Sequence, residues 1–351
     1  MERLGIFTRY DRMGASSRLR FFQWKDDFAA FGFLPEFYPF FTEDYLKKLY
    51  SCGKKSKLSL FMAAVCRFFQ LMRAPQKLLI EYELFPFLPA KWELLFLKRK
   101  RYFLGFDDNV WEKYKNNPAL ADKYDELIRH ADGVIVANDF LYEKVKPLND
   151  RILLLPTVIQ LENYQEPAPP KPERFTIGWI GTPVTYRYLE AFAEMLQQAS
   201  KEIDFDLKVI AAKHLVPISG VRMHFVDWST ENEIQELKSC HIGIMPLTDD
   251  AFSQGKSAFK LIQYLGAGLP AVASPIGENS KVITAETGFL ASSPEEWIAA
   301  LRQLAHDRTL RRKMGDAARI RAYEYSQTKY APLLEKMLCG NDNCENHPER
   351  K

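Results

Sequence analysis

The chain has 351 residues, about twice the length of a typical single domain, which predicts two cores of ordinary size. A hydrophobic fraction of 47% and a charged fraction of 26% are typical of a soluble globular protein and exclude a largely disordered one. The net charge of +3 argues against a nucleic-acid partner held by bulk charge. It leaves room for local basic patches that face phosphates or anionic lipid.

The first residues contain no apolar segment after a basic start, so the sequence predicts no secretory signal and a cytoplasmic location. Its five cysteines are odd in number and scattered, which argues against a disulfide framework. Cys339, Cys344 and His347 could suggest a metal knuckle, but a second close-spaced pair is missing. We therefore expect a polar tail and no metal site.

The longest apolar stretch, Leu58 to Met72, is too short to span a bilayer. Basic residues precede and interrupt it: Lys54, Lys55, Lys57, Arg67 and Arg73. This pattern favours a basic amphipathic helix, with peripheral contact through residues 54–73 on the inner face of a membrane. The alternative is a core helix with snorkelling basic ends.

A Pro-rich, charged run from Gln165 to Arg174 cannot continue a helix or a central strand, so it is expected to be a linker. It separates an N-terminal domain, 1–164, from a C-terminal domain, 175–325. Residues 326–351 are expected to form a last helix and a polar tail.

Each half opens with an apolar strand that leads into a turn of small residues. Leu4–Thr8 precedes Gly14–Ser17, and Phe175–Ile180 precedes Gly181–Pro183. These two similar starts predict two doubly wound, Rossmann-like α/β halves.

In chain order, buried strands of the first half are expected at 77–80, 101–106, 133–137 and 151–155. In the second half, strands are expected at 207–211, 222–227, 241–246 and 270–274, with helices near 187–202, 231–239 and 256–266. Further helices are expected at about 294–307, 309–324 and 327–338. The alternation of strand and helix predicts a parallel sheet.

One candidate site opens the predicted helix that starts with Gly255, Lys256 and Ser257. Backbone N–H groups and the positive end of a helix dipole bind anions, and Lys260 would add charge. Lys256 and Lys260 are four residues apart, hence on one helical face, and Gln263 is near that face. A pyrophosphate above the helix start and a ribose or sugar hydroxyl near Gln263 fit this pattern. A solvated basic first turn is the alternative, which the helix dipole disfavours.

A second candidate follows the first strand of the C-terminal half. Gly181 lets the backbone pass close to a ligand, Thr182 and Thr185 offer hydroxyls, and Arg187 can reach a phosphate. A simple tight turn is the alternative.

The third candidate is the turn at Gly14, which would admit a donor sugar or an acceptor in an interdomain cleft. Arg18 or Arg20 would then face negative charge. A helix start capped by Ser16 or Ser17 is the alternative.

The fourth candidate is Asp107 with Asp108, just after a strand end, where α/β sheets bind ligands. Either carboxylate could orient an acceptor hydroxyl or act as a base, and helix capping is the alternative. Glu81 and Glu83 after another strand are weaker candidates of the same kind.

The motifs resemble a known family. In the second half they are 242–247, 255–270, 272–277 and 287–291, and in the first half 131–138 and 155–157. Together they resemble family 4 retaining glycosyltransferases, which have the GT-B fold of two Rossmann-like domains facing each other across a cleft.

By that resemblance, the protein transfers a sugar from a UDP- or GDP-sugar to a hydroxyl of a glycan or lipid-linked acceptor, without a metal or other cofactor. The N-terminal domain would bind the acceptor and the C-terminal domain the donor. The residues predicted to act in catalysis are Lys256, Arg187, Asp107 and Asp108. The residues predicted to bind the donor are Gly14, Arg18, Gly181, Thr182, Gly255, Ser257, Lys260 and Gln263.

One departure from the family matters. Its two glutamates, eight residues apart, correspond here to Gly255 and Gln263, so both carboxylates are missing. A variant subgroup with a changed donor site is expected, and a catalytically inactive partner subunit that binds a nucleotide-sugar is the alternative. A Rossmann oxidoreductase is disfavoured, because neither half has G-x-G-x-x-G after its first strand.

Overall fold

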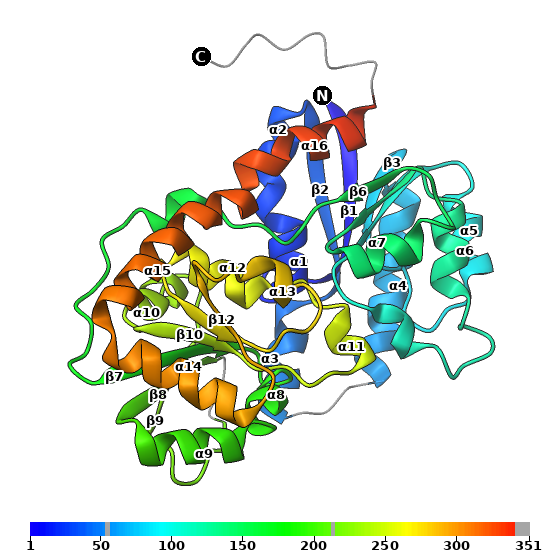
Figure 1. The fold of residues 1–351 in the computed structure, drawn as a ribbon. Helices are drawn as coiled ribbons and strands as arrows, with labels where there is room; N and C mark the ends of the chain where they lie inside the picture. The colour runs from blue at the N-terminus through cyan, green and yellow to red at the C-terminus, as the bar shows by residue number, and fades with distance from the viewer. Residues whose placement is uncertain (53–56, 212–214, 341–351) are drawn as a thin grey trace, which may run out of the picture. The chain divides into compact units, whose positions relative to one another are not determined.

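The computed structural model describes residues 1–52, 57–211 and 215–340. The chain divides into two compact units. Unit 1 comprises Met1–Thr157, Gly255–Ser257 and Tyr330–Lys351, and unit 2 comprises Val158–Gln254 and Ala258–Lys329. Each unit contains a six-stranded parallel sheet covered by helices (Figure 1). The predicted pair of doubly wound α/β sheets is therefore confirmed.

The unit 1 sheet has the order β2-β1-β3-β4-β5-β6. Its strands are β1 (Glu2–Tyr10), β2 (Phe33–Phe41), β3 (Lys77–Glu81), β4 (Arg101–Phe106), β5 (Gly133–Val136) and β6 (Ile152–Leu154). The chain leaves β1 for β2 on one side and returns to β3 on the other. The strand order therefore reverses between β1 and β3, which is where open α/β sheets bind ligands.

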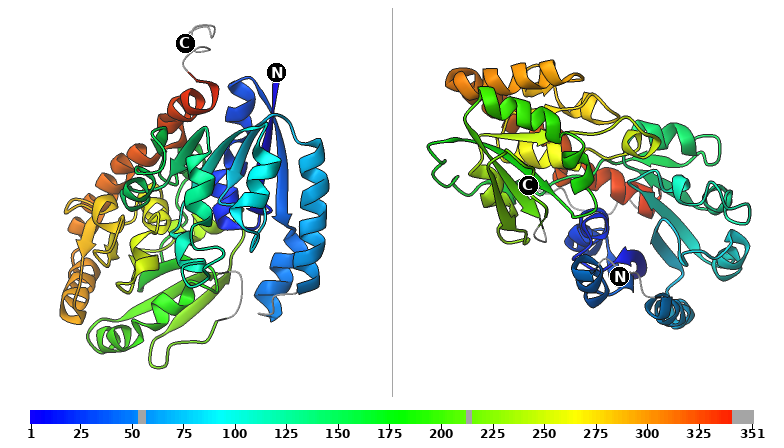
Figure 2. Two further views of the ribbon diagram at one scale, coloured as in Figure 1. Left: turned by 90° about the vertical axis from the view of Figure 1, so that its right-hand side faces the viewer. Right: turned by 90° about the horizontal axis from the view of Figure 1, so that it is seen from below.

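The helices of this part of the chain are α1 (Ala15–Arg20), α2 (Lys25–Ala30), α3 (Glu43–Cys52), α4 (Lys57–Arg73), α5 (Ala90–Leu97), α6 (Lys123–Arg129) and α7 (Asp139–Val145). Short 3₁₀ helices are η1 (Phe22–Trp24) and η2 (Val110–Lys113). Apolar side chains of β1, β3 and β4, such as Phe7, Leu78 and Leu104, build the core because these strands are buried on both faces. Helix α4 packs beside β2 and is seen along its length in Figure 2.

The unit 2 sheet has the order β12-β11-β10-β7-β8-β9, so its order reverses between β7 and β10. Its strands are β7 (Phe175–Gly181), β8 (Phe205–Ala211), β9 (Met223–Asp227), β10 (Ile242–Met245), β11 (Ala271–Ala273) and β12 (Gly288–Leu290). Its helices include α8 (Tyr186–Glu190), α9 (Ala193–Glu202), α10 (Glu233–Lys238), α11 (Ala251–Gln254), α12 (Phe259–Gly266), α13 (Asn279–Val282), α14 (Pro294–His306) and α15 (Arg308–Ala322). Two 3₁₀ helices are η3 (Leu161–Tyr164) and η4 (Tyr323–Tyr325), and α16 (Gln327–Cys339) ends the described chain.

Most expected strands and the three last helices are confirmed within two residues. Two differences are informative. Strand β2 was not predicted, because Pro35 and Pro39 interrupt its pattern; it lies at the edge of its sheet, where proline is tolerated. The predicted helix at 256–266 is wrong at its start, because α12 begins at Phe259.

Of the residues that the structure describes, none belongs to a helix long and apolar enough to cross a membrane. Cys66, Cys240 and Cys339 are free thiols. Lys54, Lys55, Cys344 and His347 lie outside the described residues.

Candidate active site

In unit 2, polar side chains gather at the carboxyl ends of β7 and β10. The backbone leaves β7 at Gly181, where a Cβ atom would lie 2.4 Å from the ring of Trp179 and 2.7 Å from Thr185 Oγ1. The next residue, Thr182, donates its backbone N–H to Thr185 Oγ1 at 3.0 Å. Gly181 is therefore required by close packing, and the turn after it is fixed by a local hydrogen bond.

Arg187 is held at this edge by a chain of hydroxyl groups. Its guanidinium donates to Tyr188 Oη at 3.0 Å and lies 4.9 Å from the centre of the Tyr188 ring. The Ser253 hydroxyl lies 3.2 Å from Tyr188 Oη and 3.1 Å from Asp250 Oδ2. Arg187, Tyr188, Thr248 and Asp250 line a cavity of about 400 Å³. This cavity lies where the strand order reverses, the usual ligand position in such sheets.

Asp250 is a residue that sequence reasoning did not select. Burial of its carboxyl group acts to raise the pKa, but hydrogen bonds from Ser253 and Thr248 outweigh that effect and lower the pKa. The bonds include Ser253 N–H at 2.8 Å and Thr248 Oγ1 at 2.8 Å. Asp250 is thus an ionised acceptor on the cavity wall, suited to a ligand hydroxyl.

Helix α12 differs from the prediction at its first turn. Ala258 precedes the helix with a φ of 52°, in the left-handed region that residues other than glycine rarely adopt. Lys260 lies in the helix, whereas Lys256 lies before it. The expectation that a helix opens at Gly255 and carries Lys256 and Lys260 on one face is therefore wrong.

The segment Gly255–Ser257 groups with unit 1. Asn138 Nδ2 donates to the Gly255 carbonyl at 2.8 Å and lies 3.3 Å from the Lys256 carbonyl. A Cβ atom on Gly255 would lie 2.6 Å from Asn109 Cβ, so glycine is needed for this contact. The donor-binding roles of Gly255 and Ser257 and the catalytic role of Lys256 stay predictions.

Two further predicted donor residues lie three positions apart in α12. Lys260 Nζ is 5.4 Å from the centre of the Trp179 ring, a cation–π distance. Gln263 is 4% exposed, and its side-chain amide has no hydrogen bond to any residue in the described part of the chain. The Gln263 amide can both donate to and accept from a ligand hydroxyl.

In unit 1, the carboxyl ends of β1, β3 and β4 carry buried carboxyl groups. Glu81 accepts hydrogen bonds from Arg9 N–H at 2.6 Å, Ser17 Oγ at 2.6 Å and Ser16 Oγ at 2.8 Å. Burial, and then the neighbouring Asp107, raise the pKa of Glu81 to about 7 despite these bonds. Glu81 therefore exchanges a proton near neutral pH.

Asp107 follows β4 as predicted and is 7% exposed. It accepts a hydrogen bond from the hydroxyl of Tyr82, which also lies 3.1 Å from Ser16 Oγ. Tyr82 has a φ of 60°, and such strained residues concentrate at functional sites. Asp108 adjoins this group in sequence, and its role stays a prediction.

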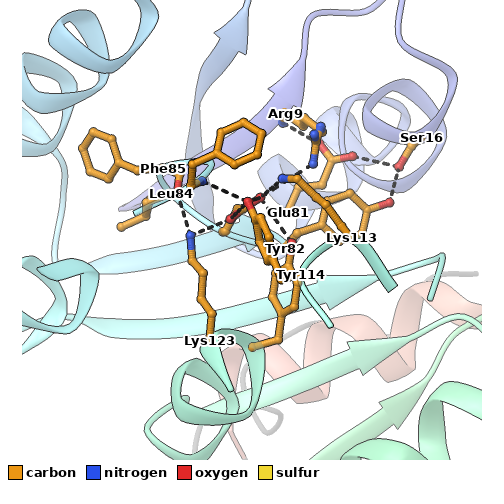
Figure 3. A network of polar contacts seen from close by, with 12 residues as sticks. Arg9, Ser16, Glu81, Tyr82, Leu84, Phe85, Lys113, Tyr114 and Lys123 are labelled. Atoms are coloured by element: carbon orange, nitrogen blue, oxygen red, sulfur yellow. Dashed lines mark hydrogen bonds and ion pairs between the residues drawn. The ribbon is translucent and has the colours of Figure 1, made fainter. Parts of the chain in front are cut away.

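A second carboxylate after β3, Glu83, is surrounded by cations and phenols. Figure 3 labels three of these neighbours, Lys113, Tyr114 and Lys123. Lys113 Nζ lies at 2.7 Å and Lys123 Nζ at 2.5 Å from its oxygens, and Tyr114 Oη donates at 3.0 Å. Although burial raises the pKa of Glu83, the two lysines lower it below its usual value. Lys123 also contacts Glu93 at 2.8 Å, so the group is an internal ion-pair network.

The turn at Gly14 has a packing reason as well as a predicted ligand role. A Cβ atom there would lie 2.4 Å from Tyr10 Cβ. Gly14 itself is the N-cap of α1, and Ser17 instead bonds Tyr10 N–H and Glu81, so capping by Ser16 or Ser17 is wrong. Arg18 lies in α1, and its donor-binding role stays a prediction.

Arg20 is buried and donates to the Leu155 carbonyl at 2.5 Å. Burial lowers its pKa, and the charges of Asp107, Tyr82 and Glu81 act to raise it. Arg20 therefore contributes positive charge to the carboxyl cluster of unit 1. Among the described residues, no group of three or more His, Cys, Asp or Glu side chains is placed to hold a metal ion.

Comparisons with known proteins now add to this geometry. Residues 174–307 match the family described as Glycosyl transferases group 1. The predicted donor-binding residues Gly181, Thr182, Lys260 and Gln263 and the predicted catalytic residue Arg187 lie inside that match. This supports a glycosyltransferase of the GT-B fold. No curated protein matches the sequence.

Solved structures share the fold over nearly the whole chain. Sucrose-phosphate synthase from Thermosynechococcus elongatus has a TM-score of 0.67 at 13% identity, covering 96% of this chain and 98% of its own. WaaG, a glycosyltransferase involved in lipopolysaccharide biosynthesis, has a TM-score of 0.68 at 15% identity, with 96% and 100% coverage. Anabaena HepE in complex with UDP has a TM-score of 0.68 at 12% identity, with 97% and 100% coverage.

Proposed function

We propose that the protein is a retaining family 4 glycosyltransferase. It transfers a sugar from a UDP- or GDP-sugar to a hydroxyl of a glycan or lipid-linked acceptor, in cell-envelope polysaccharide or glycan synthesis at the cytoplasmic face of a membrane. The observation that carries the proposal is the cavity of Arg187 and Asp250 at the reversal point between β7 and β10. It lies within the segment that matches the glycosyltransferase family.

The chemical demand in this reaction is negative charge on the departing nucleoside diphosphate. Arg187 offers a planar guanidinium that can bind two phosphate oxygens, and Lys260 adds an ammonium from α12. Thr182, in the turn after Gly181, is a further predicted donor-binding residue. Preorganised donors of this kind stabilise developing charge without a metal, so we expect no metal requirement.

The absent glutamate pair changes what holds the sugar. Gln263 keeps hydrogen-bonding capacity but supplies no charge. Asp250 supplies an ionised oxygen on the wall of the Arg187 cavity. We propose that Asp250 binds a donor hydroxyl in this subgroup.

Unit 1 would orient the acceptor. Asp107 and Glu81 lie at adjacent strand ends, and Glu81 is partly protonated near neutral pH. One carboxyl group of the pair can therefore accept a hydrogen bond from an acceptor hydroxyl while the other donates one. Asp108 is the other candidate base.

A nucleotide panel tests the proposal. UDP or GDP at about 100 times its Kd is expected to stabilise the protein by roughly 2.7 kcal/mol, read as a rise in Tm. NAD is expected to give no shift. The Arg187→Ala variant should lose most of the UDP or GDP effect, and Lys201→Ala, an exposed charge change in the same unit, should keep it. Stabilisation by NAD alone would contradict the proposal.

A catalytically inactive nucleotide-sugar-binding subunit is the second candidate, favoured by Gly255 and Gln263 at the glutamate positions. Isotope-labelled donors separate the two. Turnover or slow donor hydrolysis supports the enzyme, and tight binding with neither supports the inactive subunit.

The proposed membrane contact rests on the outward face of α4. Its exposed side chains are apolar over four turns: Leu58, Phe61, Met62, Phe68, Phe69 and Met72. Its charged mid-helix residue, Arg67, is 1% exposed and donates to the carbonyls of Tyr38 and Thr8 at 2.9 Å each. This polarity is the reverse of a solvated surface helix.

Helix α5 also has exposed apolar side chains and a buried charged one. Trp92 and Leu95 are exposed, whereas Glu93 is fully buried and accepts from the N–H groups of Leu84 and Phe85. Phe68 of α4 and Phe96 of α5 are in ring contact at 5.9 Å. The exposed charged residues near both helices are basic: Lys57, Arg73, Lys91, Lys98, Arg99 and Arg101. An apolar face bordered by cations fits an anionic lipid surface.

Liposome co-sedimentation tests this contact. Binding to vesicles with anionic lipid is expected to exceed binding to zwitterionic vesicles, and Phe61→Ser with Phe69→Ser should abolish it. Phe140→Ser, at an exposed aromatic on α7, is the matched control and should bind normally. Equal binding by all variants, or indifference to anionic lipid, would remove the membrane proposal.

A further inference from the structure

Another cavity of unit 2, about 830 Å³ in volume, lies at the opposite edge of the same sheet. Phe175, the first residue of β7, lines it, as do His241 just before β10 and Pro270 just before β11. Parallel strands begin at one edge of a sheet and end at the other. The cavity is therefore separate from the Arg187 cavity at the carboxyl ends.

The walls of this cavity are strongly basic. Its cations are Lys171, Arg174, Arg308, Arg311, Arg312 and Arg319, against the acids Glu173, Asp204 and Asp316. Arg174 pairs with Asp204 at 3.2 Å and Arg319 with Asp316 at 2.9 Å. Arg308 and Arg312 form no ion pair with any residue that the structure describes. Positive charge is thus in excess after the local pairs are made.

Burial and the excess positive charge lower the pKa values of two groups in the cavity wall, Lys171 and His241. Lys171 Nζ donates to the Cys240 carbonyl at 2.7 Å, and burial together with Arg311 and Arg319 lowers its pKa to about 8. His241 Nδ1 accepts from Thr176 N–H at 3.0 Å. Burial, Lys171 and nearby arginines lower the pKa of His241 to about 4, so it is neutral and carries its proton on Nε2. Cations held together in this way favour an anion between them.

Helix α15 fixes the geometry of the basic wall. Arg308, Arg312, Gly315 and Arg319 recur at spacings of three or four residues, so they share one helical face. Arg311 donates to the Ala305 carbonyl at 3.2 Å and lies 5.4 Å from the centre of the Phe175 ring. The arginines are therefore arranged on a rigid element before any ligand arrives.

We propose that this cavity binds a small molecule carrying two or more phosphate groups, at a site distinct from the nucleotide-sugar site. Arginine forks match phosphate oxygens in pairs, and the volume suits a metabolite rather than a macromolecule. Pro172 and Lys171 belong to the Pro-rich segment before β7, so the ligand contacts that segment as well as α15. This inference goes beyond the proposed function and does not depend on it.

Calorimetry with inorganic pyrophosphate at fixed ionic strength tests the site. Arg308→Glu with Arg312→Glu is expected to weaken binding at least roughly 10-fold, because two charge-assisted contacts are replaced by repulsion. The control Lys313→Glu reverses one charge on the same helix outside the cavity and should bind like the wild type. Single Arg308→Glu and Arg312→Glu variants match it in charge and should each bind more weakly. Single Arg308→Ala and Arg312→Ala variants serve if the double variant does not fold.

A second set of variants tests which of the two cavities binds the pyrophosphate. Lys260→Ala and Arg187→Ala alter the proposed donor site, which would also bind a diphosphate. These variants should therefore lose at most that second binding event and keep the pyrophosphate affinity of the site on α15 within about two-fold. Loss of pyrophosphate binding in these variants, with normal binding in the Arg308 and Arg312 variants, would overturn the inference. The inference would also be overturned if the double variant, Arg308→Glu with Arg312→Glu, bound pyrophosphate as tightly as the Lys313→Glu control.

Discussion

The two sheets have the same kind of strand order but carry different chemistry at their reversal points. In unit 1, the ends of β3 and β4 hold buried carboxyl groups. They pair with internal cations, as Glu83 does with Lys123, or accept from hydroxyl groups, as Asp107 does from Tyr82. In unit 2, the ends of β7 and β10 hold Arg187 and Asp250 on the wall of a cavity. The charged groups at the unit 1 edge are paired within the protein, whereas those at the unit 2 edge line a cavity.

The perturbed charge cluster of unit 1 is therefore distinct from the proposed ligand site of unit 2. The lysines around Glu83 form internal ion pairs, whereas hydroxyl groups hold Arg187 beside a cavity. Substitutions at the two edges should therefore separate stability from activity.

The largest effect is expected at Glu83. Glu83→Ala leaves Lys113 without its carboxylate partner and leaves the fully buried Lys123 with Glu93 alone, which should cost about 3–5 kcal/mol of unfolding free energy. Urea denaturation measures it. Glu126→Ala, which breaks the exposed pair with Arg129, should cost at most about 1 kcal/mol. Equal losses would show that the network contributes no more than a surface pair.

A smaller effect, on rate rather than stability, is expected at Arg187. Arg187→Ala should reduce sugar transfer roughly 10²-fold, the scale of losing one stabiliser of developing charge, with an unchanged unfolding midpoint. Lys201→Ala is the control for removing a surface cation of unit 2. The same assay on Lys256→Ala tests the role predicted for that lysine. A normal rate for Arg187→Ala would remove it from the site.

The smallest effect is a pH dependence at Glu81. Its folded pKa, about 7, lies above the ordinary 4.5, so the unfolded chain loses this proton first as pH rises. The Glu81 contribution to stability should therefore fall between pH 4.5 and 7, by on the order of 1–3 kcal/mol. Urea denaturation at pH 5 and pH 8 measures the difference. Glu81→Gln should flatten the change, and an identical pH profile would contradict the assignment.

Much of the sheet was predictable because buried parallel strands are short, continuous apolar runs. Arg101–Phe106 was predicted at its observed bounds for this reason. Strand β2 was missed because prolines obscure an edge strand. The start of α12 was misplaced because nothing in the local sequence indicates a left-handed backbone at Ala258. A glycine or asparagine at that position would have indicated one.

The site was predictable where its residues adjoin a strand end. Gly181 is the last residue of β7 and Asp107 directly follows β4, so the sequence placed both at the carboxyl edge of a sheet. The contacts of Lys113 and Lys123 with Glu83 were not predictable from the sequence. They join residues 30 and 40 positions apart, and such pairing leaves no local pattern. Asp250 was passed over because a loop carboxylate resembles any turn residue until Ser253 and Tyr188 are seen beside it.

The inward arginine of α4 has a consequence for how that helix is studied. Arg67 is matched by carbonyl groups of β1 and β2 and by the rings of Phe7 and Phe40, at 4.8 and 5.4 Å. A synthetic peptide of residues 57–73 would lack these partners and expose a guanidinium where the intact protein shows none. Bilayer insertion depths measured on such a fragment would therefore misrepresent the helix docked on its own strands.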